Sequence, residues 1–296
     1  MAIPESQLDT WSHQGAVAGS RDTYSEIKKV LEASTVPYAQ KDYKVFLQGS
    51  YGNDTNVYKE SDVDIVIQLN QTFKSDTSKL PLDQVAAWDK VYSNSSYGYY
   101  DFRKDVLTVL TDKYGNAVQV GDKAISIAAN GNRRKADVIT SLQYRRYYKF
   151  KGIFDESYDV GICFYNKSRE LIANYPTQHS ANMTTKHQLT ASWLKPMVRI
   201  VKNMRNRLID DKIIKNGIAP SYYIEGLLYN VPNDKFGTSY ADTFANVMNW
   251  ILQADRSKFV CANQQYYLLR DNFHTSWSTS NCEQFLNALK SFWNNW

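Results

Sequence analysis

The stretch Asp62–Leu69 constrains the fold of this chain more than any other, because its pattern is that of a half-buried strand. Every second residue from Val63 to Leu69 is apolar, and such alternation is typical of a β-strand with one face in a core. Asp62 and Asp64 then share the opposite face, with Cα atoms about 6.5–7 Å apart. The chain is therefore predicted to hold two carboxylates side by side on a sheet.

Two carboxylates this close repel each other, which raises the pKa of one of them unless a cation lies nearby. Mg²⁺ suits this position, because it prefers hard oxygen ligands and bridges carboxylates to substrate phosphates. In a two-metal site the ions lie about 3.5–4 Å apart and stabilise the attacking and the leaving oxygens of a displacement. Such a site usually includes a third carboxylate.

Asp137 is the candidate for the third carboxylate. It belongs to a second alternating stretch, 135–142, which can lie beside the first strand, and residues 123–127 offer a hairpin partner across the turn-forming residues 130–132. A single aspartate on a strand is more often only solvated. Three acids in this pattern, preceded by a Gly-Ser pair, instead favour a metal-dependent nucleotidyl-transfer site.

The Gly49-Ser50 pair follows a further alternating stretch, Tyr43–Gln48, and is predicted to form a turn at the end of that strand. Glycine lets the backbone approach an anion closely, and successive N–H groups in such a turn can cradle phosphate oxygens. Ser50 adds a hydroxyl donor. A Gly-Ser turn alone is common, so its weight comes from its position before Asp62 and Asp64.

At these residues the chain resembles a known family. Leu47–Ser50, Ser61–Val66 and Ala136–Val138 look like the signature of the CD-NTases, the bacterial relatives of cGAS and DncV in the polymerase-beta-like superfamily. Five further segments are similar to the CdnE type: Pro4–Leu8, Trp11–Gly15, Asn174–Pro176, Lys195-Pro196 and Pro220–Tyr222. The resemblance extends over nearly the whole chain.

The resemblance implies an α+β fold, in which a polymerase-beta-like nucleotidyltransferase core, a mixed sheet with flanking helices, packs against a helical C-terminal lobe. We expect the core and its N-terminal spine helix in residues 1–180 and the helical lobe in 181–296. Thr23-x-x-Glu26 reads as a capping box that starts the spine helix. A second helix is predicted from Tyr100 to Tyr114, ending at Gly115.

The helical half offers candidate nucleotide contacts. A helix beginning near Lys195 carries Arg199, Lys202 and Arg205 as a basic stripe, and a stripe of this kind is often only solvated. The resemblance implies that Lys202 grips the donor triphosphate. It also implies that Ser221, at the start of the next helix, contacts phosphate and that Tyr222 stacks on a base.

The sheet half offers two more nucleotide-binding candidates. The resemblance places Gln48 in the nucleotide-binding loop with Gly49 and Ser50. Asn166 ends a predicted strand, where the family places base-reading side chains, and its amide offers both a donor and an acceptor. A simple turn residue is an equally good interpretation of Asn166.

The function implied by the resemblance is a cyclic dinucleotide synthase in bacterial antiphage (CBASS) signalling. It would join two NTPs with two Mg²⁺ ions, or Mn²⁺ as the alternative, and Asp137 would help to activate the attacking hydroxyl. UTP and ATP are the favoured substrates because of Asn166 and the CdnE resemblance, which makes the expected product cyclic UMP-AMP. The product would act on a separate effector protein. A purine cyclic dinucleotide is an alternative product of the same family.

Two rival functions use the same residues. A template-independent RNA nucleotidyltransferase needs the same acids, and a nucleic-acid sensor would draw on the net charge of +5 and a basic cluster. That cluster comprises Arg133, Arg134, Lys135, Arg145 and Arg146. The scattered cysteines and histidines do not have zinc-ligand spacing, which weakens the case for a DNA sensor.

No signal sequence or membrane span is predicted. We therefore expect a cytoplasmic enzyme with reduced cysteines that requires neither a membrane nor a nucleic acid.

Overall fold

The structure, a computed structural model, describes residues 3–15, 17–59 and 62–296. The chain forms two compact units. We call one the sheet unit (Ala18–Gln48 and Asp62–Pro176) and the other the helical unit (Met1–Val17, Gly49–Ser61 and Thr177–Trp296).

The sheet unit contains seven strands in its described part, and they form one mixed sheet. The strands are β1 (Tyr43–Leu47), β2 (Val63–Asp76), β3 (Val118–Val120), β4 (Ile125–Ile127), β5 (Ala136–Phe150), β6 (Glu156–Tyr165) and β7 (Leu171–Asn174). The order β1-β2-β5-β4-β3 runs across the sheet, while β6 pairs with the far part of β5, and β7 pairs with β6. Only β2 and β5 pair in parallel among these strands. The expectation of a mixed sheet is confirmed.

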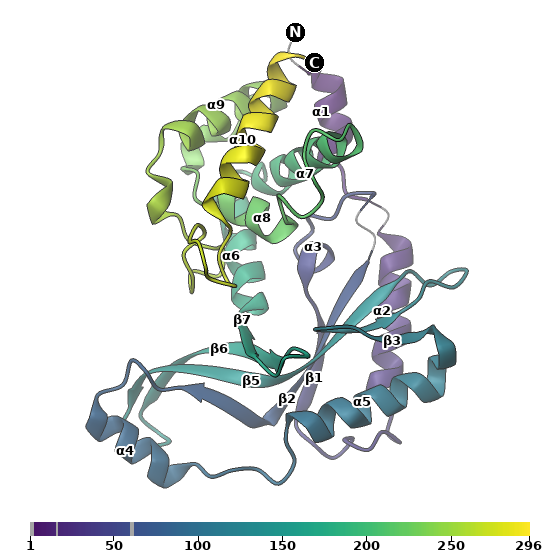
Figure 1. The fold of residues 1–296 in the computed structure, drawn as a ribbon, viewed down its shortest axis with the longest axis vertical. Coiled ribbons are helices and arrows are strands. Elements are labelled where there is room, and N and C mark those ends of the chain that lie inside the picture. Colours follow the sequence, from purple (N-terminus) through teal and green to yellow (C-terminus); the bar gives the residue numbers. More distant parts are fainter. Residues whose placement is uncertain (1–2, 16, 60–61) are drawn as a thin grey trace. The chain divides into compact units, whose positions relative to one another are not determined.

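Three helices flank this sheet: α2 (Ala18–Leu31), α4 (Leu82–Val91) and α5 (Tyr99–Tyr114). Figure 1 shows α2 and α5 lying beside each other on the sheet and α4 at the far end of β5. The predicted helix from Tyr100 is confirmed, and it ends at Gly115, where φ is +54°, a conformation that glycine adopts at little cost.

The predicted capping box of the first long helix is wrong. Helix α2 begins at Ala18, so Thr23 lies inside it. Thr23 Oγ1 donates to the carbonyl of Gly19 at 2.7 Å and accepts from the backbone N–H of Arg134 at 2.9 Å. The hydroxyl therefore fixes the segment that leads into β5 instead of starting the helix.

The helical unit contains α1 (Glu5–Ser12), α3 (Gly49–Gly52), α6 (Pro176–Leu189, whose first residue belongs to the sheet unit), α7 (Leu194–Asp210), α8 (Ser221–Tyr229), α9 (Tyr240–Gln253) and α10 (Thr279–Asn294). Three short 3₁₀ turns complete the described elements: Gly115–Ala117 in the sheet unit, and Asn233–Lys235 and Arg256–Lys258 in the helical unit. Helix α7 packs against α1, α8, α9 and α10.

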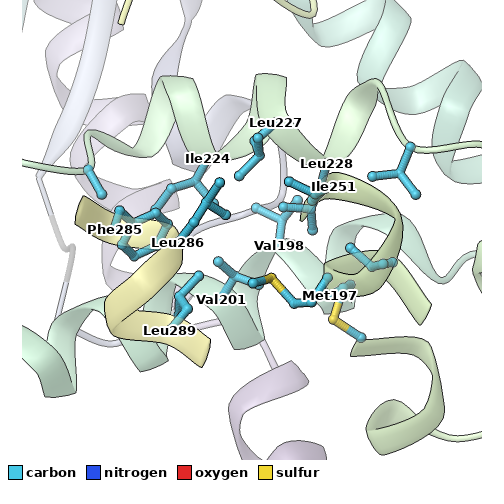
Figure 2. Close-up of a cluster of buried hydrophobic side chains, with 14 of the residues drawn as sticks. Met197, Val198, Val201, Ile224, Leu227, Leu228, Ile251, Phe285, Leu286 and Leu289 are labelled. Atoms are coloured by element: carbon cyan, nitrogen blue, oxygen red, sulfur yellow. The ribbon is translucent and has the colours of Figure 1, made fainter. Parts of the chain in front are cut away.

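The core of the helical unit includes an apolar cluster around α7 (Figure 2). Met197, Val198 and Val201 of α7 face side chains from the three helices around them. These are Ile224, Leu227, Leu228, Ile251, Phe285, Leu286 and Leu289. Burying such side chains contributes about 1.5–3 kcal/mol each relative to exposure, so this cluster stabilises the unit.

The chain passes from the sheet unit to the helical unit after Pro176, whereas the division was predicted at residue 180. Two earlier segments nevertheless belong to the helical unit, because Ile3 and Leu8 are buried in its apolar cluster and Gly49–Ser61 packs with its helices. Hydrophobic periodicity predicts a helix but does not say which core the helix joins. In the described residues, no helix is long and apolar enough to cross a membrane.

Candidate functional site

The register of the sheet places two of the three predicted acids side by side. Asp64 of β2 and Asp137 of β5 are Cα partners in the parallel pairing of these strands. Asp62 precedes β2 by one residue, and its side chain is 46% exposed. Since side chains two apart on an extended chain point the same way, the three carboxylates belong to one face at the start of β2 and β5.

Ser126 fixes the orientation of Asp137. It is the cross-strand partner of Asp137 in the antiparallel pairing of β4 and β5, and its hydroxyl donates to Asp137 Oδ1 at 2.5 Å. A hydrogen bond from a neighbouring residue of this kind orients a carboxylate for an incoming ligand. The predicted hairpin between the segment around 123–127 and β5 is thus confirmed, and it supplies a positioning group that the sequence pattern did not identify.

Lys135 contributes a cation to the same group of acids. Its Nζ donates to Asp62 Oδ2 at 2.5 Å and lies 3.8 Å from Asp137 Oδ2. The hydrogen bond to Asp62 raises the pKa of Lys135 against the smaller opposing effect of burial, and the charges of the three acids raise it further. The strand pattern could have revealed this position, because Lys135 lies two residues before Asp137 and so shares its face.

The donor set suits a hard divalent cation, because it offers three carboxylates. The single Lys135 ammonium balances only one of their negative charges. Among residues 3–15, 17–59 and 62–296, however, no group of three acidic, histidine or cysteine side chains is already arranged as metal ligands. In this structure the Lys135 ammonium, rather than a metal ion, is bonded to Asp62. The residue types at this site therefore fit a divalent metal.

The predicted Gly-Ser turn is the short helix α3. Gly49 has φ of +68°, a value that favours glycine. The backbone N–H of Asn53 bonds to the Gly49 carbonyl at 3.1 Å, and that of Thr55 bonds to the Ser50 carbonyl at 2.9 Å. These bonds hold the turn compact.

Gln48 lies in the sheet unit, just before this turn. Its backbone N–H bonds to the carbonyl of Asp64 at 3.0 Å, which fixes the end of β1 to the acid-bearing strand. Its side-chain Oε1 is buried and has no hydrogen-bond partner within the described residues. A buried acceptor of this kind is costly unless a ligand or water satisfies it.

Lys202 lies in a buried polar network in this structure, and its predicted contact with the donor triphosphate stays a prediction. The side chain is fully buried, and Nζ bonds to Glu225 Oε1 at 2.8 Å and to the carbonyl and hydroxyl of Thr55, both at 3.2 Å. Arg205 is also buried, so the predicted basic stripe is not a surface stripe. The predicted helix is confirmed, but Lys202 and Arg205 lie on the buried side of that helix.

Glu225 is the centre of this buried polar network, which sequence reasoning missed. Besides Lys202, it accepts hydrogen bonds from Asn53 at 3.0 Å and from Thr55 at 2.5 Å, and it pairs with His179 at 2.6 Å. Burial by itself raises the pKa of Glu225, but the Lys202 ammonium and His179 outweigh it and hold that pKa well below the usual range. The network anchors the segment that follows α3.

Ser221 and Tyr222 open α8, as predicted, with Pro220 at its N-cap. Ser221 Oγ accepts from Arg205 at 3.4 Å. Tyr222 stacks on the His179 ring with centroids 4.9 Å apart, and its hydroxyl accepts from Asn263 at 2.9 Å. The aromatic face of Tyr222 is therefore packed on a protein ring in this structure.

Asn166 lies in the turn between β6 and β7. Its Nδ2 donates to Glu170 Oε2 at 2.7 Å, and its Oδ1 accepts from the Glu170 N–H at 2.8 Å. This geometry is that of a turn-forming residue, which was one of the two open interpretations. The base-reading interpretation stays a prediction.

Comparisons with known proteins show what this chain is similar to. Residues 181–294 match the family described as the cGAS/DncV-like nucleotidyltransferase C-terminal helical domain. Over 298 residues the chain is 39% identical to the cyclic UMP-AMP synthase of Rhodothermus marinus, a match that covers 100% of this chain and 99% of the relative.

Two solved structures are also similar. That of the Rhodothermus marinus CdnE c-UMP-AMP synthase with Apcpp and Upnpp has a TM-score of 0.89 at 39% identity and covers 99% of this chain and 97% of its own. That of the Elizabethkingia meningoseptica CdnE cyclic dinucleotide synthase with GTP and Apcpp has a TM-score of 0.77 at 28% identity and covers 99% of this chain and 98% of its own.

Proposed function

The chain belongs to the cGAS/DncV-like nucleotidyltransferases, and we propose on this basis that it is a cyclic dinucleotide synthase, which joins two NTPs and releases pyrophosphate. The observation that carries the proposal is the placement of Asp64 beside Asp137, with Asp62 bound to the same Lys135 ammonium. Full-length similarity to a cyclic UMP-AMP synthase supports it.

In the proposed reaction, a ribose hydroxyl of one nucleotide attacks the α-phosphate of the other, and pyrophosphate leaves. A second step of the same kind closes the ring. Asp62, Asp64 and Asp137 would hold two Mg²⁺ ions, with Mn²⁺ as the alternative. When bound, such ions stabilise charge on the attacking and the leaving oxygen. Ser126 holds Asp137 in place for the attacking hydroxyl.

The nucleotide contacts are also part of the proposal. The N–H groups of α3 and the Ser50 hydroxyl would bind phosphate, and the unsatisfied Gln48 Oε1 would accept a bond from the nucleotide. As the resemblance implies, Ser221 would contact phosphate and Tyr222 would stack on a base. For Lys202 we favour a positioning role, because its ammonium is bonded to Glu225 and Thr55.

We propose cyclic UMP-AMP as the product, with UTP and ATP as substrates. The support is the 39% identity with the Rhodothermus marinus synthase. A purine product is the alternative, since the similar Elizabethkingia meningoseptica structure holds GTP and Apcpp. Incubation with all four NTPs, one of them radiolabelled in each reaction, followed by nuclease digestion, identifies the incorporated bases. Incorporation of purines alone would refute the uridine assignment.

The sensor and RNA-extension alternatives receive less support from the structure. The side chain of Arg133 bonds to Glu26, Lys135 to Asp62, Arg145 to Gln143 and Arg146 to Asp76. A phosphate backbone is bound by basic side chains that are available to it. Most side chains of the basic cluster are instead bonded to other residues of the sheet unit.

Activity without nucleic acid tests the proposal. Wild-type protein with NTPs and Mg²⁺ is expected to release pyrophosphate and to form a cyclic product when no RNA or DNA is present. A strict requirement for RNA, with extension of that RNA, would favour the rival enzyme. The proposal further includes a cytoplasmic location, where NTPs are available, and a product that acts on a separate effector in antiphage signalling.

A further inference from the structure

We propose that Lys135 is a tethered cation that competes with divalent ions for Asp62, Asp64 and Asp137, so that metal binding requires its ammonium to leave the acids. This inference rests on the metal use in the proposed function. It adds a residue to the metal site that is not itself a ligand but sets the affinity of the site.

The contacts define the competition. Nζ of Lys135 lies 2.5 Å from Asp62 Oδ2 and 3.8 Å from Asp137 Oδ2. Mg²⁺ binds a carboxylate oxygen at about 2.0–2.1 Å, so an ion on either oxygen would lie within a few ångströms of the ammonium. Like charges at such a distance repel each other strongly. The ion pair between Lys135 and Asp62 therefore disfavours a metal ion on Asp62, and the metal ion disfavours the ion pair.

The surroundings of Lys135 let its side chain leave without disturbing the sheet. Its side chain is 48% exposed, and its long stem can carry the charge into solvent. Its backbone carbonyl accepts from the N–H of Val63 at 3.0 Å, and β5 begins at the next residue, Ala136. The backbone stays paired while only the side chain moves.

The alternative is that Lys135 forms an ordinary exposed ion pair with no effect on metal binding. Lys149 offers a matched control, because it lies near the far end of β5, the strand that follows Lys135, pairs with Asp155 and has a side chain 43% exposed. Removing either lysine deletes one exposed ion pair from the sheet unit. Only the removal of Lys135 deletes a cation that lies beside Asp62, Asp64 and Asp137.

Direct binding of Mn²⁺, followed by electron paramagnetic resonance of the free ion, tests the inference without turnover. We expect Lys135→Ala to bind Mn²⁺ about two- to tenfold more tightly than wild type, since the ion no longer displaces an exposed ion pair. Lys135→Arg, which keeps the charge, should not bind more tightly than wild type. Lys149→Ala should match wild type, and Asp64→Asn should lose the bound ion.

Thermal unfolding supplies a second readout. Without metal, Lys135→Ala should have a lower Tm than wild type because the acids lose their counterion, and saturating Mn²⁺ should remove that difference. Equal Mn²⁺ affinity in wild type and Lys135→Ala would overturn the inference but leave the proposed function standing. A failure of every variant, including wild type, to bind Mn²⁺ in the presence of an NTP analogue would contradict the proposed function itself.

Discussion

The substitution Glu225→Gln tests the buried polar network of the helical unit. Glutamine has almost the same shape as glutamate but no charge, so it leaves the Lys202 ammonium buried without its counterion. The side chains of Glu225 and Lys202 are 3% and 0% exposed, so solvent cannot compensate. Breaking a buried ion pair by removing one partner costs about 3–5 kcal/mol.

The loss appears as a lower thermal midpoint. At about 2–4 °C for each kcal/mol in units of this size, Glu225→Gln should lower the Tm of the helical unit by about 6–20 °C at pH 7. Because the folded-state pKa of Glu225 is lowered, its contribution is present above the unfolded pKa near 4.3 and is lost as the pH falls below it. The difference in Tm between wild type and Glu225→Gln should therefore become smaller at acidic pH.

Differential scanning calorimetry measures both effects, with Glu283→Gln as the control. Glu283 pairs with Arg256 in the same unit, but its side chain is 43% exposed, so that substitution should cost less than about 1 kcal/mol. The double variant Glu225→Gln with Lys202→Met should be less destabilised than the sum of its parts, because it removes both charges. A cost of Glu225→Gln no larger than that of the control would refute this reasoning.

Three further predictions concern other parts of the molecule. Ser126→Ala removes the hydrogen bond to Asp137 and should lower turnover about 10–100-fold with little change in Tm; unchanged turnover would remove Ser126 from the site. Gly161→Ala should cost about 1–3 kcal/mol in urea unfolding, because its Cβ would lie 2.6 Å from the Asn174 carbonyl oxygen; full stability would contradict the tight contact of β6 with β7. Burial raises the pKa of Cys261 to about 11, so iodoacetamide at pH 8 should label this thiol slowly in the native protein and quickly in urea; fast native labelling would show that the thiol is accessible.

The strands that carry the acids could be predicted because their alternation is local. The pattern of Asp62–Leu69 predicts the strand and the face that carries the acids, and the same holds around Asp137. It does not predict that Val66 and Gln68, farther along the acid-bearing face, are buried as well. The parallel pairing that brings Asp64 opposite Asp137 is not local, since a long connection separates β2 from β5. The sequence analysis placed the two stretches beside each other, but it did not specify their parallel register, which residue spacing alone could not give.

The buried network could not be predicted, because it depends on tertiary contacts between distant segments. Periodicity placed Lys202 on a basic stripe, and charged residues are almost never fully buried unless they are paired. The partner, Glu225, lies on another helix, and Thr55 follows α3. Lys135 was missed for a different reason: it was grouped by charge with its neighbours Arg133 and Arg134, although its position two residues before Asp137 places it with the acids.

The most direct test of the central claim is mass spectrometry of the product formed by wild type and by the double variant Asp62→Asn with Asp64→Asn. With four NTPs and Mg²⁺ but no nucleic acid, we predict a cyclic dinucleotide and pyrophosphate from wild type, and neither from a variant that retains its circular dichroism spectrum. Product formation by the folded double variant, or no cyclic product from wild type, would contradict the assignment of these carboxylates to nucleotidyl transfer.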